Sequence, residues 1–111
     1  MTGLGAGLAA CHPFDAAGLG DPKAGAAVID RQQCGSCHVI PGVANADGEA
    51  GPSLAGFAGR SMIGGMLPNS PAGLVAWLRS PQSVVPGNAM PDMGLSQQQA
   101  QDVAAYLYTL R

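Results

Sequence analysis

The run Cys34-Gly35-Ser36-Cys37-His38 constrains this chain more than any other part of its sequence. Two cysteines separated by two residues and followed directly by histidine are typical of a c-type haem attachment site. Each thiol can add across one vinyl group of a porphyrin, and the adjacent histidine can offer its imidazole to the iron. The run therefore predicts one covalently bound haem c, attached through Cys34 and Cys37, with His38 as an axial ligand of the iron.

Two other kinds of site also use a C-x-x-C pair. A redox-active dithiol would leave His38 without a role, and it is typical of a βαβ pattern that this sequence lacks. A zinc site needs two more ligands at a suitable spacing, and only Cys11 and His12 remain, next to each other near the terminus. The haem site is the stronger interpretation.

A bound haem would also supply a core that the side chains cannot build alone. The chain has 111 residues, which fits one domain. Although 47% of its residues are apolar, it has only one Trp, two Tyr and two Phe. Small chains that are poor in bulky side chains usually need a staple, and a porphyrin wrapped by helices would serve as one.

Charge and hydropathy exclude two classes of partner. The net charge is −2 and 11% of the residues are charged, which argues against the basic footprint of a nucleic-acid-binding protein. No stretch approaches the roughly 18 consecutive apolar residues of a membrane-spanning helix. We therefore expect no nucleic acid and no spanning segment.

The leading residues differ from the rest of the chain. Residues 1–20 are rich in Gly, Ala and Leu without sustained periodicity, so we interpret them as a leader remnant or tether ahead of a domain at 21–111. Within them, Leu8-Ala9-Ala10-Cys11 resembles a lipobox, in which Cys11 would become the acylated N-terminus. A secretory leader also needs a basic region, and no Lys or Arg precedes Lys23. A lipid anchor and an incidental thiol both stay open.

Start and stop signals predict three helices. A capping residue followed by proline opens the first helix at Asp21-Pro22 and the second at Ser70-Pro71. The first should run to about Gln33, and Pro81 should end the second. The third opens with a capping box, an S-x-x-Q sequence at residues 96–99, and should continue through residue 110.

Apolar residues at helical spacing give each helix a buried face. These residues are Val28 and Ile29 in the first helix, Leu74, Trp77 and Leu78 in the second, and Val103, Tyr106, Leu107 and Leu110 in the third. Residues 39–69 hold most of the Gly and Pro, and no convincing strand is present. The fold class is therefore all-α, and so long a loop suits a compact domain only if it packs against a haem face.

The second axial ligand decides whether the iron transfers electrons or binds ligands. The candidates are Met62, Met66, Met90, Met93 and His12. Met90 lies in a loop, residues 86–91, that two prolines stiffen, and such a loop can position the sulfur of a weak Fe–S bond in advance. Thioether sulfur favours ferrous iron. We therefore predict Met90 as the ligand and Met93 as its main competitor. The methionines at 62 and 66 are better explained as fillers of core gaps, and His12 lies in the leading segment.

The haem motif, the Pro-Gly-x-x-Met loop and the final helix occur in the order seen in class I c-type cytochromes, and the chain resembles this family over residues 21–111. The resemblance implies a small cytochrome c fold, in which three main helices and long loops wrap around one covalently bound haem. It also implies that Gly25 lets the last helix cross the first closely, with Tyr106 packed against it. The carbonyl of Pro52 should accept the N–H of His38 and fix the ring.

The same resemblance implies three further residues around the haem. Arg60 falls where the family often has a basic residue near a propionate, although a solvated surface position explains it nearly as well. Trp77 should pack against the haem, with a propionate hydrogen bond as a sharper possibility. Asn88 should hydrogen-bond inside the pocket on the Met90 side. The family's lysine ring for docking is in doubt, because Lys23 is the single lysine of the chain.

An iron with both axial positions filled binds no substrate, so the resemblance implies a mono-haem electron carrier and not an enzyme. The loop and the last helix are similar to those of bacterial cytochrome domains that serve terminal oxidases. The expected partners are redox proteins met transiently: a terminal oxidase, a quinol–cytochrome c reductase or a dehydrogenase. A membrane would be reached only through a lipid on Cys11 or through a larger complex. Because haem is attached to such thiols outside the bacterial cytoplasm, a periplasmic location is expected.

Two other functions stay open at this point. The domain could be the haem-bearing relay subunit of a dehydrogenase or of a sulfur-oxidising enzyme complex. It could also hold a labile sixth ligand, as a gas sensor or a peroxidase-like site does, which would give high-spin ferric iron and fast carbon monoxide binding.

Overall fold

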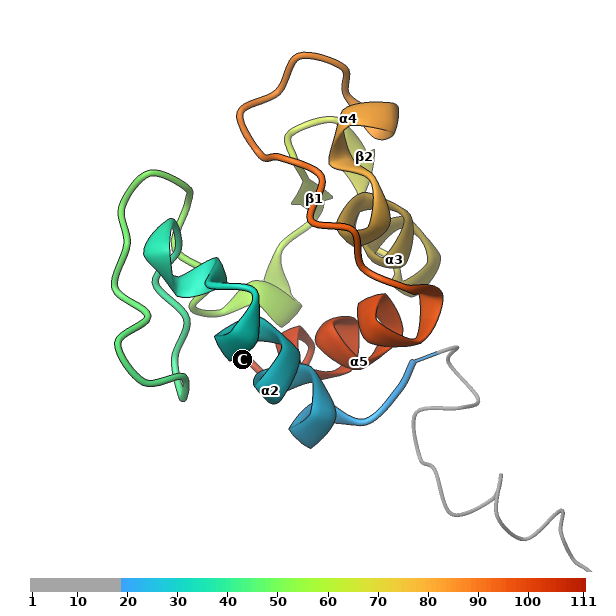
Figure 1. Cartoon of the computed structure of the whole chain (residues 1–111). Coiled ribbons are helices and arrows are strands. Elements are labelled where there is room, and N and C mark those ends of the chain that lie inside the picture. Colours follow the sequence, from blue (N-terminus) through green and yellow to red (C-terminus); the bar gives the residue numbers. More distant parts are fainter. Residues whose placement is uncertain (1–18) are drawn as a thin grey trace, which may run out of the picture.

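The computed structural model describes residues 19–111, and the expectations for Cys11 and His12 lie outside this range. The described part of the chain is mostly helical, which agrees with the predicted all-α class (Figure 1). Its α-helices are α2 (Pro22–Arg31), α3 (Pro71–Arg79), α4 (Pro81–Val84) and α5 (Gln97–Leu107). Two 3₁₀ turns, η2 (Cys34–Ser36) and η3 (Phe57–Gly59), and two short strands, β1 (Met62–Ile63) and β2 (Leu67–Pro68), complete it. No helix in residues 19–111 is long and apolar enough to cross a membrane.

Helix α2 begins as predicted and ends two residues early. The Asp21 side chain accepts a hydrogen bond from the Lys23 backbone N–H at 3.0 Å, and Pro22 occupies the first helical position. Val28 and Ile29 are buried, as expected. The helix stops at Arg31 because Gln33 adopts a left-handed conformation, with φ of 62°, which ends a helix and redirects the chain. That redirection leads directly into η2 and the haem motif.

The first and last helices cross at Gly25, which confirms the role implied for this glycine. A Cβ placed on Gly25 would lie 1.9 Å from the carbonyl oxygen of Asp102 and 2.5 Å from its carbon, so only glycine permits this approach. The Tyr106 hydroxyl, one turn further along α5, donates to the Pro41 carbonyl at 2.5 Å. Tyr106 therefore ties α5 to the loop that follows the motif.

Asp102 joins the two ends of the domain. It is buried, and its Oδ1 accepts hydrogen bonds from the Asp21 backbone N–H and from the Gln98 side chain, both at 2.9 Å. The backbone N–H of Gly20 donates to the Gln101 carbonyl at 3.1 Å, and Leu19 is buried in the core. These two residues precede the predicted domain start at residue 21, a boundary that stays a prediction.

Replacing Asp102 with alanine should destabilise the fold by about 1–3 kcal/mol, because the N–H of Asp21 would lose its acceptor next to the α2 start. The midpoint of chemical denaturation of the haem-loaded protein measures this loss. Asp30→Ala, on the exposed face of α2, is the control and should change stability by less than about 0.5 kcal/mol. Equal effects of the two substitutions would contradict the role given to Asp102.

Helices α3 and α5 follow their predicted signals. The Ser70 hydroxyl accepts from the Gly73 N–H, and the predicted capping box of α5 is present between Ser96 and Gln99. Leu74 and Leu78 are buried as expected, and Trp77 is half-buried. Helix α5 ends at Leu107, three residues before the predicted end. The N–H groups of the next residues bond to carbonyls only three positions back, Thr109 to Tyr106 and Leu110 to Leu107, which tightens the last turn out of the α-helix.

Two elements were absent from the sequence-based expectation. Strands β1 and β2 form an antiparallel hairpin, with Ile63 opposite Leu67. Gly64 and Gly65 turn the chain in left-handed conformations, and the Trp77 ring lies so close that a Cβ on Gly64 would meet it at 2.7 Å. Helix α4 also appears because Pro81 not only ends α3 but opens a further turn. Packing against Trp77, and not local strand propensity, accounts for the hairpin.

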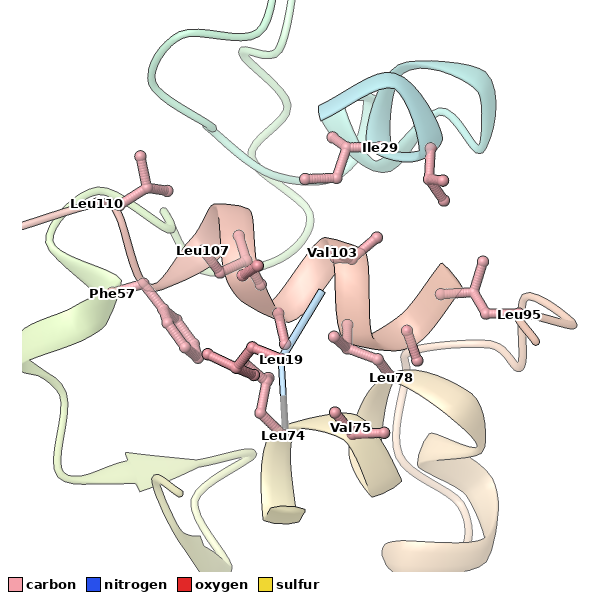
Figure 2. Close-up of a cluster of buried hydrophobic side chains, with 14 of the residues drawn as sticks. Leu19, Ile29, Phe57, Leu74, Val75, Leu78, Leu95, Val103, Leu107 and Leu110 are labelled. Carbon is pink, nitrogen blue, oxygen red and sulfur yellow. The ribbon is translucent and has the colours of Figure 1, made fainter. Parts of the chain in front are cut away.

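The hydrophobic core lies around α5, which packs against α2 as well as against α3. In Figure 2, Leu74, Val75 and Leu78 of α3 lie on one side of α5, and Ile29 of α2 lies on the other, above Val103. The core also takes in buried residues of the leading and middle segments, which are Leu19, Ile29, Ile40, Phe57, Ile63 and Leu95. The core therefore holds α5 as the central element, and the loops bearing the predicted ligands extend from it.

Candidate haem site

The haem motif forms a single helical turn. The backbone N–H groups of Cys37 and His38 both donate to the Cys34 carbonyl, at 3.1 and 3.0 Å. Residues at positions i, i+3 and i+4 of such a turn lie on one face. The spacing therefore places both thiols and the imidazole on the same side of the backbone, which is the arrangement that two thioether bonds and one axial ligand require.

The two thiols have different surroundings. Cys34 is half-buried against the core and Cys37 is exposed, and neither is in a disulfide. Burial raises the pKa of the Cys34 thiol above its usual value of 9.0, and the neighbouring Cys37 adds to the increase. Both sulfurs are therefore free to carry haem, and Cys34 is the one that the core shields.

The His38 ring is held in a defined orientation. Its Nδ1 lies 2.7 Å from the Pro52 carbonyl oxygen, the contact that the family resemblance implied. A carbonyl only accepts, so Nδ1 is the donor of this bond, and Nε2 is the ring nitrogen that is left for a metal. A metal-binding histidine is usually fixed in this way. The ring thus fits an iron ligand through Nε2, although the ligation itself stays a prediction.

Gly51 lets the chain pass over this ring. Its N–H donates to the Cys37 carbonyl at 2.7 Å, and a Cβ on Gly51 would lie 2.4 Å from His38 Cε1. The loop that contains it also contacts the motif through Gly48, whose N–H donates to the Gly35 carbonyl at 3.0 Å. The exposed residues Asp47 and Glu49 therefore lie in a loop packed on the motif, a proximity that the sequence did not reveal.

Replacing Gly51 with alanine should push the His38 ring away from the Pro52 carbonyl, because the added methyl group and the ring cannot occupy the same space. We expect the hydrogen bond to lengthen, weakening the ligand field, and stability to fall by about 1–3 kcal/mol. The reduction potential, which responds to the axial ligand field, and thermal unfolding of the loaded protein measure these changes. Gly59→Ala is the control, because a Cβ at position 59 would have no atom within 4 Å. Gly56 also has open space, but its positive φ would add backbone strain to any substitution.

The second predicted ligand lies in the loop between α4 and α5. Met90 is half-buried and packs against the core, and so does Met93. The Met90 backbone is fixed on both sides: its N–H donates to Asn88 Oδ1 at 2.7 Å, and its carbonyl accepts from Gln82 Nε2 at 2.8 Å. These bonds fix the Met90 backbone, which supports Met90 as the first choice of ligand.

Asn88 makes hydrogen bonds on the Met90 side of the domain. Its Nδ2 donates to the carbonyls of Pro81 and Val85, at 3.0 and 2.8 Å, and its Oδ1 accepts from Met90. The amide thus bonds to the backbone of its own loop and of α4. Its observed role is to shape the Met90 loop, and a hydrogen bond inside the haem pocket stays a prediction.

Three other expectations can be compared with the structure. Met62 and Met66 are exposed, to 44% and 67%, so their interpretation as core fillers is wrong: the hairpin that carries them leaves both on its outer side. The Arg60 guanidinium donates to the Ser53 carbonyl and lies 5.7 Å from the centre of the Phe57 ring. Its contact with a propionate stays a prediction. Trp77 packs beneath the hairpin turn, and its haem contact is likewise untested.

The ligand-bearing segments lie on different sides of the fold. In Figure 1 the motif turn (teal) lies on one side of the molecule and the loop after α4 (orange) on the other, with α5 passing below both. A surface groove of about 600 Å³ lies elsewhere, between α3 and the start of α5, and neither His38 nor Met90 lines it. The free thiols, the oriented imidazole and the fixed thioether loop together fit a covalent haem.

Gln82 is a residue of this site that the sequence analysis did not find. Its side chain bonds to three backbone groups of the Met90 loop. A glutamine after a proline has no distinctive spacing, so only the folded loop reveals what it contacts.

Known proteins are similar to most of this chain. A profile of the family described as cytochrome c matches residues 22–111. The chain is 36% identical over 88 residues to cytochrome c oxidase subunit 2 of Alkalihalophilus pseudofirmus, covering 78% of this chain and 25% of that protein. It is 33% identical over 93 residues to the subunit of the same name from Bacillus sp. (strain PS3), covering 80% of this chain and 26% of that protein. The chain thus spans about a quarter of the length of these relatives.

Two solved structures share the fold. SoxXA from P. pantotrophus superposes with a TM-score of 0.66 at 21% identity, covering 83% of this chain and 82% of that one. Cytochrome c2 from Rhodobacter sphaeroides superposes with a TM-score of 0.61 at 23% identity, covering 82% of this chain and 96% of that one. Identities this low show a shared fold and nothing more specific.

Proposed function

This chain belongs to the cytochrome c family, and on that premise we propose that it is a mono-haem carrier that shuttles single electrons to or from a respiratory complex, with a terminal oxidase as its electron acceptor. Family membership establishes the small cytochrome c fold, one covalent haem c and electron transfer as the general role. The observation that carries the oxidase assignment is the likeness, over about four-fifths of the chain, to two proteins named cytochrome c oxidase subunit 2.

The geometry supports an iron that is closed on both sides. The haem, when bound, supplies the one-electron redox chemistry. The protein's contribution is to hold His38 by its bond to Pro52 and to hold the Met90 backbone at both its N–H and its carbonyl. A carrier of this kind needs no substrate site, because electrons pass through the haem edge near the motif turn.

The same proposal includes a location in the cell and a kind of partner surface. Attachment of haem to Cys34 and Cys37 fits export to the periplasm. A lipid on Cys11 would tether the domain and raise its effective concentration near membrane partners. The exposed Asp47 and Glu49 lie in the loop packed on the motif, so a partner with a basic surface fits better than one that reads a lysine ring.

The alternative of a relay subunit in a dehydrogenase or sulfur-oxidising complex has weaker support. The likeness to SoxXA is one of fold alone, at 21% identity. By contrast, the oxidase relatives are similar in sequence. We therefore propose the oxidase as the partner and keep the relay subunit as the outcome that the experiment below can reveal.

The test follows oxidation of the ferrous, haem-loaded protein by purified terminal oxidase in the presence of oxygen. We expect oxidation to be catalytic in oxidase, to stop with cyanide, and to slow as salt increases because exposed charges steer the encounter. Ferrous protein that the oxidase leaves reduced, but that a co-purifying dehydrogenase reduces rapidly, would overturn the oxidase assignment in favour of the relay subunit. Fast carbon monoxide binding would instead overturn the closed iron.

A further inference from the structure

One side chain of α4 forms hydrogen bonds to the backbone of the loop that carries Met90. We propose that Gln82, on α4, is a positioning residue that keeps the Met90 thioether on the iron against competing ligands. This inference rests on the proposed function, since it takes Met90 as the second axial ligand.

The Gln82 amide makes bonds to both sides of the loop. Its Nε2 donates to the carbonyls of Asn88 and Met90, at 2.7 and 2.8 Å, and its Oε1 accepts from the Gly87 N–H at 3.0 Å. A primary amide has two N–H donors and one carbonyl oxygen. Both donors and the oxygen are therefore engaged, and all three partners are backbone groups within four residues of one another.

The start of the loop bonded to Gln82, residues 85–88, is a β-turn. The Asn88 N–H bonds to the Val85 carbonyl at 3.2 Å, with Pro86 second in the turn and Gly87 third at a φ of 84°. Proline followed by glycine in this conformation is typical of a type II turn. The turn fixes the start of the loop, and Gln82 connects that start to Met90.

Two further hydrogen bonds hold the same loop. Asn88 Oδ1 accepts from the Met90 N–H at 2.7 Å, so the Met90 backbone is held by Asn88 on one side and by Gln82 on the other. The Gln82 backbone N–H donates to Asp92 Oδ1 at 3.0 Å, which ties the far end of the loop back to α4. Side-chain and backbone groups of Gln82 thus hold the loop between α4 and α5 at four residues, which are Gly87, Asn88, Met90 and Asp92.

These bonds matter because an external ligand can bind the ferric iron only when the thioether leaves it. The apparent affinity of such a ligand is therefore proportional to the fraction of molecules whose loop is open. Removing the Gln82 amide deletes two half-buried hydrogen bonds and one exposed one, each with a modest net contribution to the closed loop. We expect the open fraction, and with it the affinity for an external ligand, to rise about tenfold.

The experiment titrates imidazole into the ferric, haem-loaded protein and follows the loss of the sulfur-to-iron charge-transfer band. Gln82→Ala and Gln82→Glu should both bind imidazole about tenfold more tightly than the unaltered protein. The glutamate variant matches the glutamine in size but cannot donate to the two carbonyls, so it separates hydrogen bonding from packing. Ser83→Ala is the matched control on the same helix: its hydroxyl bonds to Ser80 and not to the loop.

Amide hydrogen exchange of the unaltered protein gives a second measurement that needs no variant to fold. The amides of Gly87 and Met90, which donate to Gln82 and Asn88, should be protected relative to an unstructured chain. Exchange at the unstructured rate, or imidazole affinities of both Gln82 variants within twofold of Ser83→Ala, would overturn the inference.

Met90→Ala separates this inference from the proposed function. If that variant loses the charge-transfer band while the Gln82 variants behave like the control, the ligand assignment holds and the positioning role fails. If Met90→Ala keeps the band, the ligand assignment fails, and the role of Gln82 fails with it.

Discussion

Replacing Met90 with alanine should abolish the near-infrared sulfur-to-iron charge-transfer band of the ferric protein and convert the iron from low-spin to high-spin. Met90 is half-buried, and its backbone is held at both its N–H and its carbonyl. Because thioether ligation raises the reduction potential, we expect the potential to fall by on the order of 100 mV, within the range of about 0.8 V that axial ligands control. Absorption spectroscopy, electron paramagnetic resonance and voltammetry measure these three changes.

Met93→Ala is the matched control, since Met93 is also half-buried and lies only three residues further on. It should keep both the band and the potential. The reverse result, with the band lost in Met93→Ala and kept in Met90→Ala, would identify Met93 as the ligand. Carbon monoxide should bind the ferrous Met90→Ala protein rapidly and the unaltered protein slowly, because only the variant offers an open position on the iron.

Gly25→Val should have the largest effect on folding. Even a single Cβ at this position would lie 1.9 Å from a backbone carbonyl oxygen of α5, and the backbone has no flexible end that could move aside. We expect Gly25→Ala to cost about 3 kcal/mol, or about 15 °C in the melting temperature. A loss of this size is a large part of the stability of a small domain, so the bulkier valine should prevent folding of the loaded protein. Circular dichroism at rising temperature measures both variants.

Gly59→Ala is the control for this substitution. Gly59 has no atom within 4 Å of its Cβ position, and its φ is not in the left-handed range. The melting temperature should stay within a few degrees of that of the unaltered protein. A Gly25→Ala protein that melts together with Gly59→Ala would show that α2 and α5 can separate without cost, contrary to the packing described here.

The helices were predictable because their signals are local. Proline after a capping residue marks the starts of α2 and α3, and the Ser96–Gln99 capping box marks the start of α5. Their ends were less predictable. Helix α2 ends where Gln33 takes a left-handed conformation, and α5 ends where its hydrogen bonds shorten to three residues. These helix ends depend on contacts that the following segments make. They do not alter the spacing of apolar residues in the sequence, so periodicity does not predict them.

The hairpin shows why loops resist prediction from local sequence. Two-residue strands have too few residues for an alternating pattern, and the Gly64 turn is held by Trp77 of a different element. The same holds for the exposed Met62 and Met66, whose apolar character suggested burial. Burial depends on which side of the hairpin faces the core, and that side is set by tertiary packing.

The sequence by itself determined the cofactor, the family and the identity of the predicted ligands, because these depend on residue type and short-range spacing. The C-x-x-C-H run identifies two thiols and an imidazole at the spacing of one turn, and the structure places them on one face of such a turn. Tertiary structure alone decided how the predicted ligands are held: the Pro52 carbonyl on His38, and Gln82 with Asn88 around Met90. These hydrogen bonds join residues that lie apart in the chain or across a turn, so their partners exist only once the backbone has folded.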